Sequence, residues 1–182
     1  MVKGRRPFTV EEYRRLLEAG VLREGDPGEL SEGEILEMSP MGSRHVATVN
    51  GLARFFFSQV GDRAMVSVQN PIRLGEVSEP QPDLALLPRP DDYAAAFPQG
   101  EDALLRVEVA DPSQAHDREV KPPLYAKAGI AEVGLLDLVG GRLEVYRKPS
   151  PEGYRERHLI EEGEVALLAF PEARLALKRV LP

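Results

Sequence analysis

Two acidic residues, Asp83 and Glu108, lie within short apolar runs that have the length and the valine and leucine content of buried strands. A carboxylate on such a strand is costly to bury unless another group pairs with it. Two carboxylates on neighbouring strands can share a divalent cation, and a nearby lysine, Lys121, would complete a site that cleaves phosphodiester bonds. The alternative is structural, because acidic residues at strand ends often cap the next turn or pair with an arginine.

Three helices are expected to position these residues. The first begins at Thr9, which forms a capping-box pattern with Glu12, and it stops at Gly20. The second covers residues 43–60, where apolar residues recur at helical spacing. The third lies within residues 116–128, and its two consecutive prolines leave open whether it begins near Asp117 or near Lys121.

The strands alternate with these helices. A hairpin is expected over residues 29–38, with its turn near Glu32 and Gly33. Further strands are expected over residues 65–74, 83–87, 104–109, 133–138, 142–147, 154–160 and 165–168. We therefore predict an α/β fold in which a mixed sheet is flanked by helices. The 182 residues are expected to form a single domain, with an N-terminal helical segment (1–27), a core (28–138) and a C-terminal β extension (139–182).

The composition limits the classes of function. The chain contains no cysteine, which excludes disulfides, thiolate zinc sites and cysteine nucleophiles. It has no apolar run long enough to span a membrane and no secretory signal, so a cytoplasmic location is expected. The net charge of −7 argues against a strong nucleic-acid binder, although a metal ion at an acidic site inverts the local sign of the potential.

A series of short motifs follows in order over residues 29–137. They are Glu29-Leu30, Gly33-Glu34, Met38-Ser39-Pro40, His45, Gln69, Pro80-Gln81-Pro82-Asp83, Glu108-Val109, Ser113, Asp117, Lys121, Tyr125, Gly129 and Asp137. No single motif is specific, whereas the ordered set is. The set resembles the PD-(D/E)XK nuclease superfamily, and more closely a bacterial family of restriction-endonuclease-like proteins of unknown specificity.

The resemblance implies a restriction-endonuclease-like fold and an endonuclease that hydrolyses DNA with Mg²⁺, or with Mn²⁺ in its place. It implies that Asp83, Glu108 and the backbone carbonyl of Val109 hold the metal, and that Lys121 acts with them in catalysis. By analogy with other nucleases of this architecture, a homodimer is one assembly to consider.

The chain departs from the superfamily at one chemical position. The superfamily places its lysine two residues after the glutamate, on the same face of the strand. Here that position is Ala110. The bacterial family typically carries the lysine on the following segment instead, which here is Lys121. The alternative for Lys121 is a solvent-facing lysine on a helix.

Four residues are candidates for supporting roles. His45, at the start of the second helix, could face a phosphate or a metal-bound water, or it could be a capping or surface residue. Glu34 could be a further acidic ligand or an exposed hairpin carboxylate. Gln69 and Ser113 are candidates for orienting the carboxylates.

Two functions from different classes remain open at this point. The carboxylate pair, the lysine and the resemblance favour a Mg²⁺-dependent endonuclease. The acidic composition and the missing strand lysine favour a non-catalytic binding or assembly module on a nuclease-like scaffold.

Overall fold

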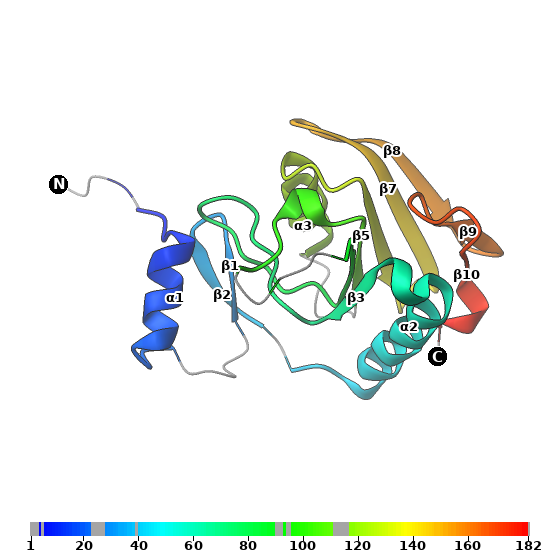
Figure 1. Ribbon diagram of the computed structural model, residues 1–182, viewed down its shortest axis with the longest axis horizontal. Coiled ribbons are helices and arrows are strands. Elements are labelled where there is room, and N and C mark those ends of the chain that lie inside the picture. Colours follow the sequence, from blue (N-terminus) through cyan, green and yellow to red (C-terminus); the bar gives the residue numbers. More distant parts are fainter. Residues whose placement is uncertain are drawn as a thin grey trace.

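A six-stranded mixed sheet with the strand order β3-β4-β5-β6-β7-β8 forms the centre of the computed structural model (Figure 1). The structure describes residues 4, 6–22, 28–38, 40–89, 93, 96–110 and 117–181, with side chains in the last range described from residue 120 onward. The six strands are β3 (Met65–Val68), β4 (Leu84–Leu87), β5 (Leu105–Ala110), β6 (Glu132–Asp137), β7 (Arg142–Ser150) and β8 (Gly153–Ile160).

The direction of the strands follows from their connections. β5 and β6 are parallel, and the helix α3 (Asp117–Lys127) lies between them in the sequence. A parallel pair needs such a crossover, because the chain must return to the same end of the sheet. The other neighbouring pairs in this sheet are antiparallel. The fold is therefore α/β with a mixed sheet, as predicted.

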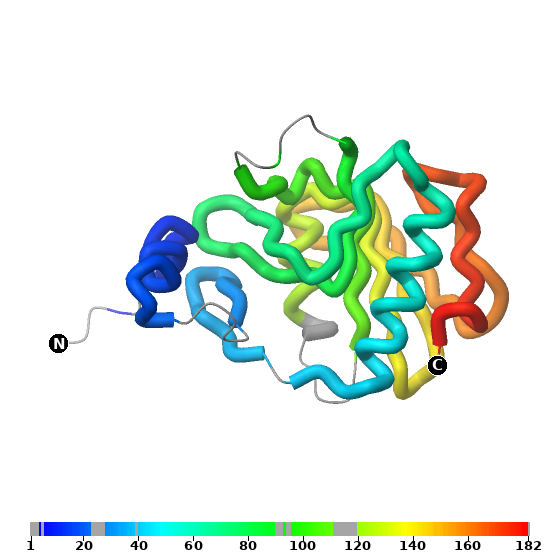
Figure 2. The backbone as a smooth tube through the Cα atoms, turned by 60° about the horizontal axis from the view of Figure 1, so that its bottom comes forward, coloured from blue at the N-terminus to red at the C-terminus, as the bar shows by residue number. Residues whose placement is uncertain are grey.

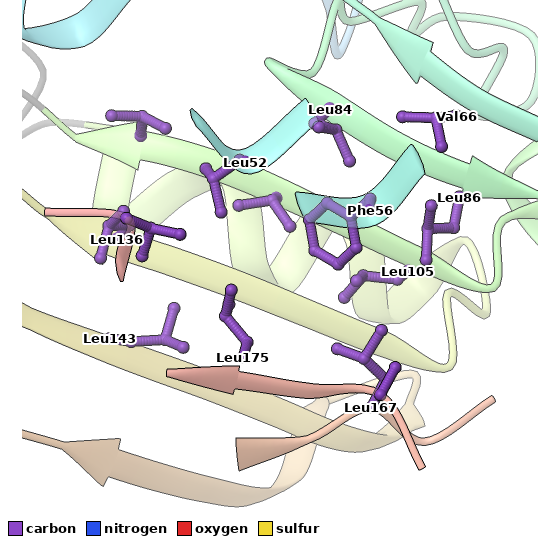
Figure 3. Packing of buried hydrophobic residues seen from close by; sticks show 14 of the residues in the cluster. Leu52, Phe56, Val66, Leu84, Leu86, Leu105, Leu136, Leu143, Leu167 and Leu175 are labelled. Carbon is purple, nitrogen blue, oxygen red and sulfur yellow. The ribbon is translucent and has the colours of Figure 1, made fainter. Parts of the chain in front are cut away.

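The two faces of the sheet carry different helices. The helix α2 (Ser43–Val60) packs its apolar side, including Leu52 and Phe56, on a face that includes Leu84, Leu86 and Leu105 (Figure 3). α3 packs on the opposite face, where Leu124 and Tyr125 join a second buried cluster with Ala85, Leu87 and Val133. Consecutive residues of a strand point to opposite faces, so each strand contributes to both clusters.

Smaller elements flank the sheet, with α1 and the first hairpin on one side of the molecule and β9 and β10 on the other (Figures 1 and 2). The helix α1 (Val10–Glu18) packs on the hairpin of β1 (Gly28–Ser31) and β2 (Glu34–Glu37) through Val10, Tyr13 and Leu30. At the C-terminal end, β9 (Glu164–Ala166) pairs with β10 (Arg174–Ala176) and adds Leu167 and Leu175 to the α2-side core. Short 3-10 turns cover Gly61–Arg63, Gly100–Asp102 and Leu177–Arg179. No helix within the described ranges is both long enough and apolar enough to cross a membrane.

Several predicted elements agree with the structure. Thr9 caps α1, and the reciprocal contacts between Thr9 and Glu12 form a capping box. The first hairpin turns at Glu32 and Gly33, which both have positive φ. α2 has the predicted bounds.

Other predictions need correction. The strand predicted over residues 65–74 ends at Val68, because Gln69 adopts a positive φ of 51° and turns the chain out of the ladder. Ile72 and Leu74 are nevertheless buried, so their apolar character reflects packing of a loop against the α3 side of the core. α3 begins at Asp117 and contains Pro122 and Pro123 in its interior, which selects the earlier of the two predicted starts. β10 was not predicted.

Candidate active site

The register of β4 and β5 sets the positions of the two candidate carboxylates. Leu84 pairs with Val107 in this antiparallel ladder, so the next step along it places Asp83, just before β4, opposite Glu108. Side chains at directly opposite positions have Cβ atoms roughly 5 Å apart. Asp83 and Glu108 therefore come together at one end of the sheet, on the face that α3 covers.

These side chains line a pocket of about 300 Å³. Residues from the first hairpin, the N-terminal turn of α2, the loop after β3, β5 and α3 converge there. The lining consists of Gly28, Met38, Pro40, Met41, His45, Gln69, Gln81, Asp83, Glu108 and Lys121. Five of the residues predicted for the site thus share one pocket.

Asp83 is held by donors on both of its oxygens. His45 Nε2 lies 2.7 Å from Asp83 Oδ1, and Gln69 Nε2 donates to the same oxygen at 3.4 Å. The backbone N–H of Val109 donates to Asp83 Oδ2 at 2.8 Å. His45 is buried and occupies the first turn of α2, so its imidazole fixes the Asp83 carboxylate rather than facing solvent.

Glu108 also has several partners. Lys121 Nζ lies 3.4 Å from Glu108 Oε2, and the Tyr125 hydroxyl donates to Glu108 Oε1 at 2.5 Å. Lys121 and Tyr125 are four residues apart on α3 and therefore face the same way. An Nη atom of Arg106 lies 3.7 Å from Glu108 Oε1. Burial raises the pKa of Tyr125 well above its ordinary range, so its hydroxyl keeps the proton that it donates.

Lys121 reaches the carboxylates from α3, which is required if it replaces the lysine that the superfamily carries at the position of Ala110. It is buried, and its Nζ lies between Glu108 Oε2 and Glu29 Oε1, with the latter 3.8 Å away. A solvent-facing lysine is thereby excluded. Ala110, the usual strand position of the lysine, is the last residue of β5.

Three residues of this cluster were not among the candidates from sequence. Glu29, on β1, is buried, pairs with Lys121 and accepts a hydrogen bond from the backbone of Gln81. Arg106 precedes Glu108 by two residues and so shares its face of β5. Tyr125 belongs to the core, and its hydroxyl also contacts Glu108. Two features of the sequence could have identified members of this cluster. Arg106 is a charged residue inside an apolar strand, and Tyr125 has the i, i+4 spacing from Lys121.

One supporting candidate does not line the pocket. Glu34 is exposed on β2 and is not among the lining residues. Ser113 lies outside the described residues. Val109 contributes its backbone N–H to Asp83, while the predicted role of its carbonyl stays a prediction.

The donor set suits a hard divalent cation. Asp83 and Glu108 offer carboxylate oxygens, and Mg²⁺ is typically bound by one or two carboxylates while it keeps several waters. Within the described ranges, no group of three or more His, Asp and Glu side chains is arranged as a metal site. An ion at this pair would thus need water or backbone oxygens to complete its coordination, which Mg²⁺ and Mn²⁺ accept more readily than Zn²⁺.

The sheet, the crossover helix and the cluster of carboxylates with a lysine define a nuclease-like α/β protein. Residues 10–178 match the family described as "Uma2: Putative restriction endonuclease", and the chain belongs to this family. A solved structure described as a putative nuclease belonging to DUF820 from Anabaena variabilis ATCC 29413 superimposes with a TM-score of 0.76 at 21% identity, covering 96% of this chain and 97% of that one. The restriction-endonuclease-like fold is therefore shown. No curated protein of similar sequence was found.

The contacts of Arg106 generate a prediction about stability. Its side chain is 0% exposed, and none of its guanidinium nitrogens has a hydrogen-bond partner among the described residues. Glu108 is the counter-charge within 4 Å. We expect Glu108→Gln to lower the free energy of unfolding by roughly 3 kcal/mol, because it leaves a buried guanidinium without its anion.

Urea unfolding followed by circular dichroism measures this change. The double variant Glu108→Gln with Arg106→Met should recover most of the loss, since it removes the orphaned charge and keeps an apolar side chain of similar length. A Glu108→Gln variant that unfolds at the same urea concentration as the unmodified protein would show that the fold does not depend on this ion pair.

Proposed function

We propose that the protein is a DNA endonuclease that hydrolyses phosphodiester bonds with Mg²⁺, or Mn²⁺, bound at Asp83 and Glu108. The observation that carries this proposal is the position of Lys121. Its ammonium lies 3.4 Å from Glu108 Oε2, in the pocket that Asp83 also lines. Two carboxylates and a lysine, drawn from separate elements, are the groups that this reaction needs at one place.

Each residue has a distinct task in this proposal. The ion would neutralise the phosphate and lower the pKa of the attacking water. Asp83 and Glu108 hold the ion, and His45 together with the Val109 N–H fixes the orientation of Asp83. Lys121 stabilises the negative charge that develops on the phosphate oxygens. Glu29, on its other side, holds the ammonium in place.

The missing strand lysine was one argument for a non-catalytic module. Lys121 on α3 answers it, because Ala110 no longer implies that the site lacks a cation. The acidic composition was the other argument, but the acidic residues are unevenly distributed along the chain. None of the 18 residues of α2 is acidic, and this helix presents Arg44 and Arg54 on its exposed side. Its first turn carries His45 into the pocket. This surface suits a phosphate backbone that leads into the site.

The first test is DNA cleavage by the purified protein. Supercoiled plasmid and single-stranded DNA should be cleaved with Mg²⁺ or Mn²⁺ and not with EDTA. Asp83→Asn should reduce the rate at least about a hundredfold, because the interactions of a bound ion with the transition state are worth several kcal/mol. Asp62→Ala, an exposed aspartate near the opposite end of α2, is the matched control and should cleave normally. Cleavage that persists in EDTA or in Asp83→Asn would contradict the proposal.

The second test concerns Lys121. Lys121→Met keeps most of the side-chain volume and should lower kcat by about 10²–10³-fold, because a positioned charge of this kind acts on the transition state. Mn²⁺ affinity should be retained or should rise, since a cation beside the ligands is lost. Lys127→Met, on the same helix but exposed, is the matched control.

Returning an amine to the strand, with Ala110→Lys in the Lys121→Met background, should restore part of the activity. If Lys121→Met cleaves at the normal rate, the helix lysine has no catalytic role.

The third test concerns the α2 surface. With Asp83→Asn to prevent cleavage, Arg44→Glu and Arg54→Glu should each weaken duplex binding in fluorescence anisotropy. Each should also reduce the slope of log K against log salt by about one. Arg155→Glu on β8 is the control, because it makes the same change of charge at another exposed position, and it should weaken binding less. Equal losses in all three variants would indicate that net charge, rather than this surface, governs binding.

A further inference from the structure

The two oxygens of Glu108 lie in different surroundings. Oε2 is the oxygen next to Lys121, which lines the pocket. Oε1 is the oxygen next to Tyr125 and Arg106, which are both fully buried and are not among the lining residues. One oxygen thus points toward the pocket, and the other points into the protein interior.

The Oε1 side is blocked in two ways. The Tyr125 hydroxyl donates to Oε1 at 2.5 Å and so occupies one of its lone pairs. The Arg106 guanidinium, 3.7 Å from the same oxygen, places a permanent positive charge where a second metal contact would have to form.

The two blocking groups also hold each other. The guanidinium carbon of Arg106 lies 3.8 Å from the centre of the Tyr125 ring, so the cation rests on the aromatic face whose hydroxyl binds Glu108. Because Arg106 makes no hydrogen bond within the described residues, its place is set by this ring and by Glu108. Arg106, Tyr125 and Glu108 therefore form one connected cluster behind the pocket.

We propose that Tyr125 and Arg106 restrict Glu108 to binding a metal through one oxygen, and that this makes the site favour Mg²⁺ and Mn²⁺ over Ca²⁺. This inference rests on the proposed metal site. Ca²⁺ takes six to eight oxygens and often uses both oxygens of one carboxylate, whereas Mg²⁺ binds through fewer protein oxygens at short distance and keeps its waters. When Oε1 is blocked, Ca²⁺ cannot bind both oxygens of Glu108 and loses affinity, whereas the affinity for Mg²⁺ changes little.

Competition for bound Mn²⁺ tests the inference without any measurement of activity. The electron paramagnetic resonance signal of free Mn²⁺ reports how much ion the protein holds, and Mg²⁺ or Ca²⁺ is then added to displace it. In the unmodified protein, Mg²⁺ should displace Mn²⁺ at least as well as Ca²⁺ does. In Tyr125→Phe, the ratio of Ca²⁺ to Mg²⁺ affinity should rise about tenfold, the effect of one hydrogen bond to a charged group.

The chain offers a matched control for this variant. The Tyr146 hydroxyl donates to Glu144 Oε2 at 2.6 Å, so Tyr146→Phe removes the same type of bond away from the pocket and should leave the ratio unchanged. Arg106→Met is a second, independent variant that should also raise the ratio, because it removes the positive charge beside Oε1. Thermal unfolding confirms that each variant is folded before its ratio is compared.

The outcomes separate the two proposals. If the unmodified protein binds no Mn²⁺ at millimolar concentration, or binds it equally well with Asp83→Asn, the metal site is wrong and this inference falls with it. If Mn²⁺ binding depends on Asp83 but both folded variants keep the ratio of the unmodified protein, only the inference is overturned. A ratio that rises equally in Tyr146→Phe would also overturn it.

Discussion

The site depends on the interactions that allow the charge of Glu108 to be buried near the end of β5. A carboxylate at this depth is tolerated because Arg106, Lys121 and the Tyr125 hydroxyl surround it. The dependence runs in both directions, since Arg106 has no hydrogen bond of its own among the described residues. The charges that would do chemistry are thus also charges that hold β5 and α3 together.

The topology explains why a lysine from a helix can replace one from a strand. β5 and β6 are parallel, so the chain must cross over, and the crossover helix α3 packs on the face of the sheet that carries Glu108. A side chain on the buried side of α3 consequently points at the carboxylates. The antiparallel partner β4 brings Asp83 opposite Glu108 by register alone. One parallel and one antiparallel neighbour of β5 are therefore enough to assemble two carboxylates and an ammonium group.

Much of the fold and of the site followed from local patterns in the sequence. Apolar runs identified the central strands, helical spacing gave α2 its bounds, and the Thr9 capping box located the start of α1. Asp83, Glu108 and Lys121 were predicted as a set from their types and their places in the chain. The family resemblance strengthened this prediction, since each residue alone also fits a structural role. The structure brings the three into one pocket.

What the sequence did not provide depends on contacts between distant segments. Glu29 reads as an ordinary hairpin carboxylate until β1 is placed next to Lys121. Residues 65–74 alternate weakly, as a strand does, but the positive φ of Gln69 ends the ladder, and Ile72 and Leu74 fill the core from a loop. The i, i+4 spacing of Tyr125 from Lys121 places both on one side of α3, but it does not show that the Tyr125 hydroxyl meets a carboxylate. The exposed Glu34 shows the converse, because an acidic residue within a matching motif need not line the pocket.

The distribution of charge along β5 accounts for the position of the lysine. Arg106, Glu108 and Ala110 share one face of the strand, so the cation on this strand precedes the glutamate instead of following it. Arg106 occupies the interior side and is 0% exposed, where it neutralises Glu108 but cannot reach a ligand in the pocket. The proposed reaction would then need a second cation on the open side, and this cation would have to face Asp83 and Glu108 without adding a further charge to the strand. Lys121 meets this condition from α3, where Glu29 on one side and Glu108 on the other compensate the cost of burying its ammonium. The strand thus supplies the cation that is buried behind Glu108, and the helix supplies the cation that lines the pocket.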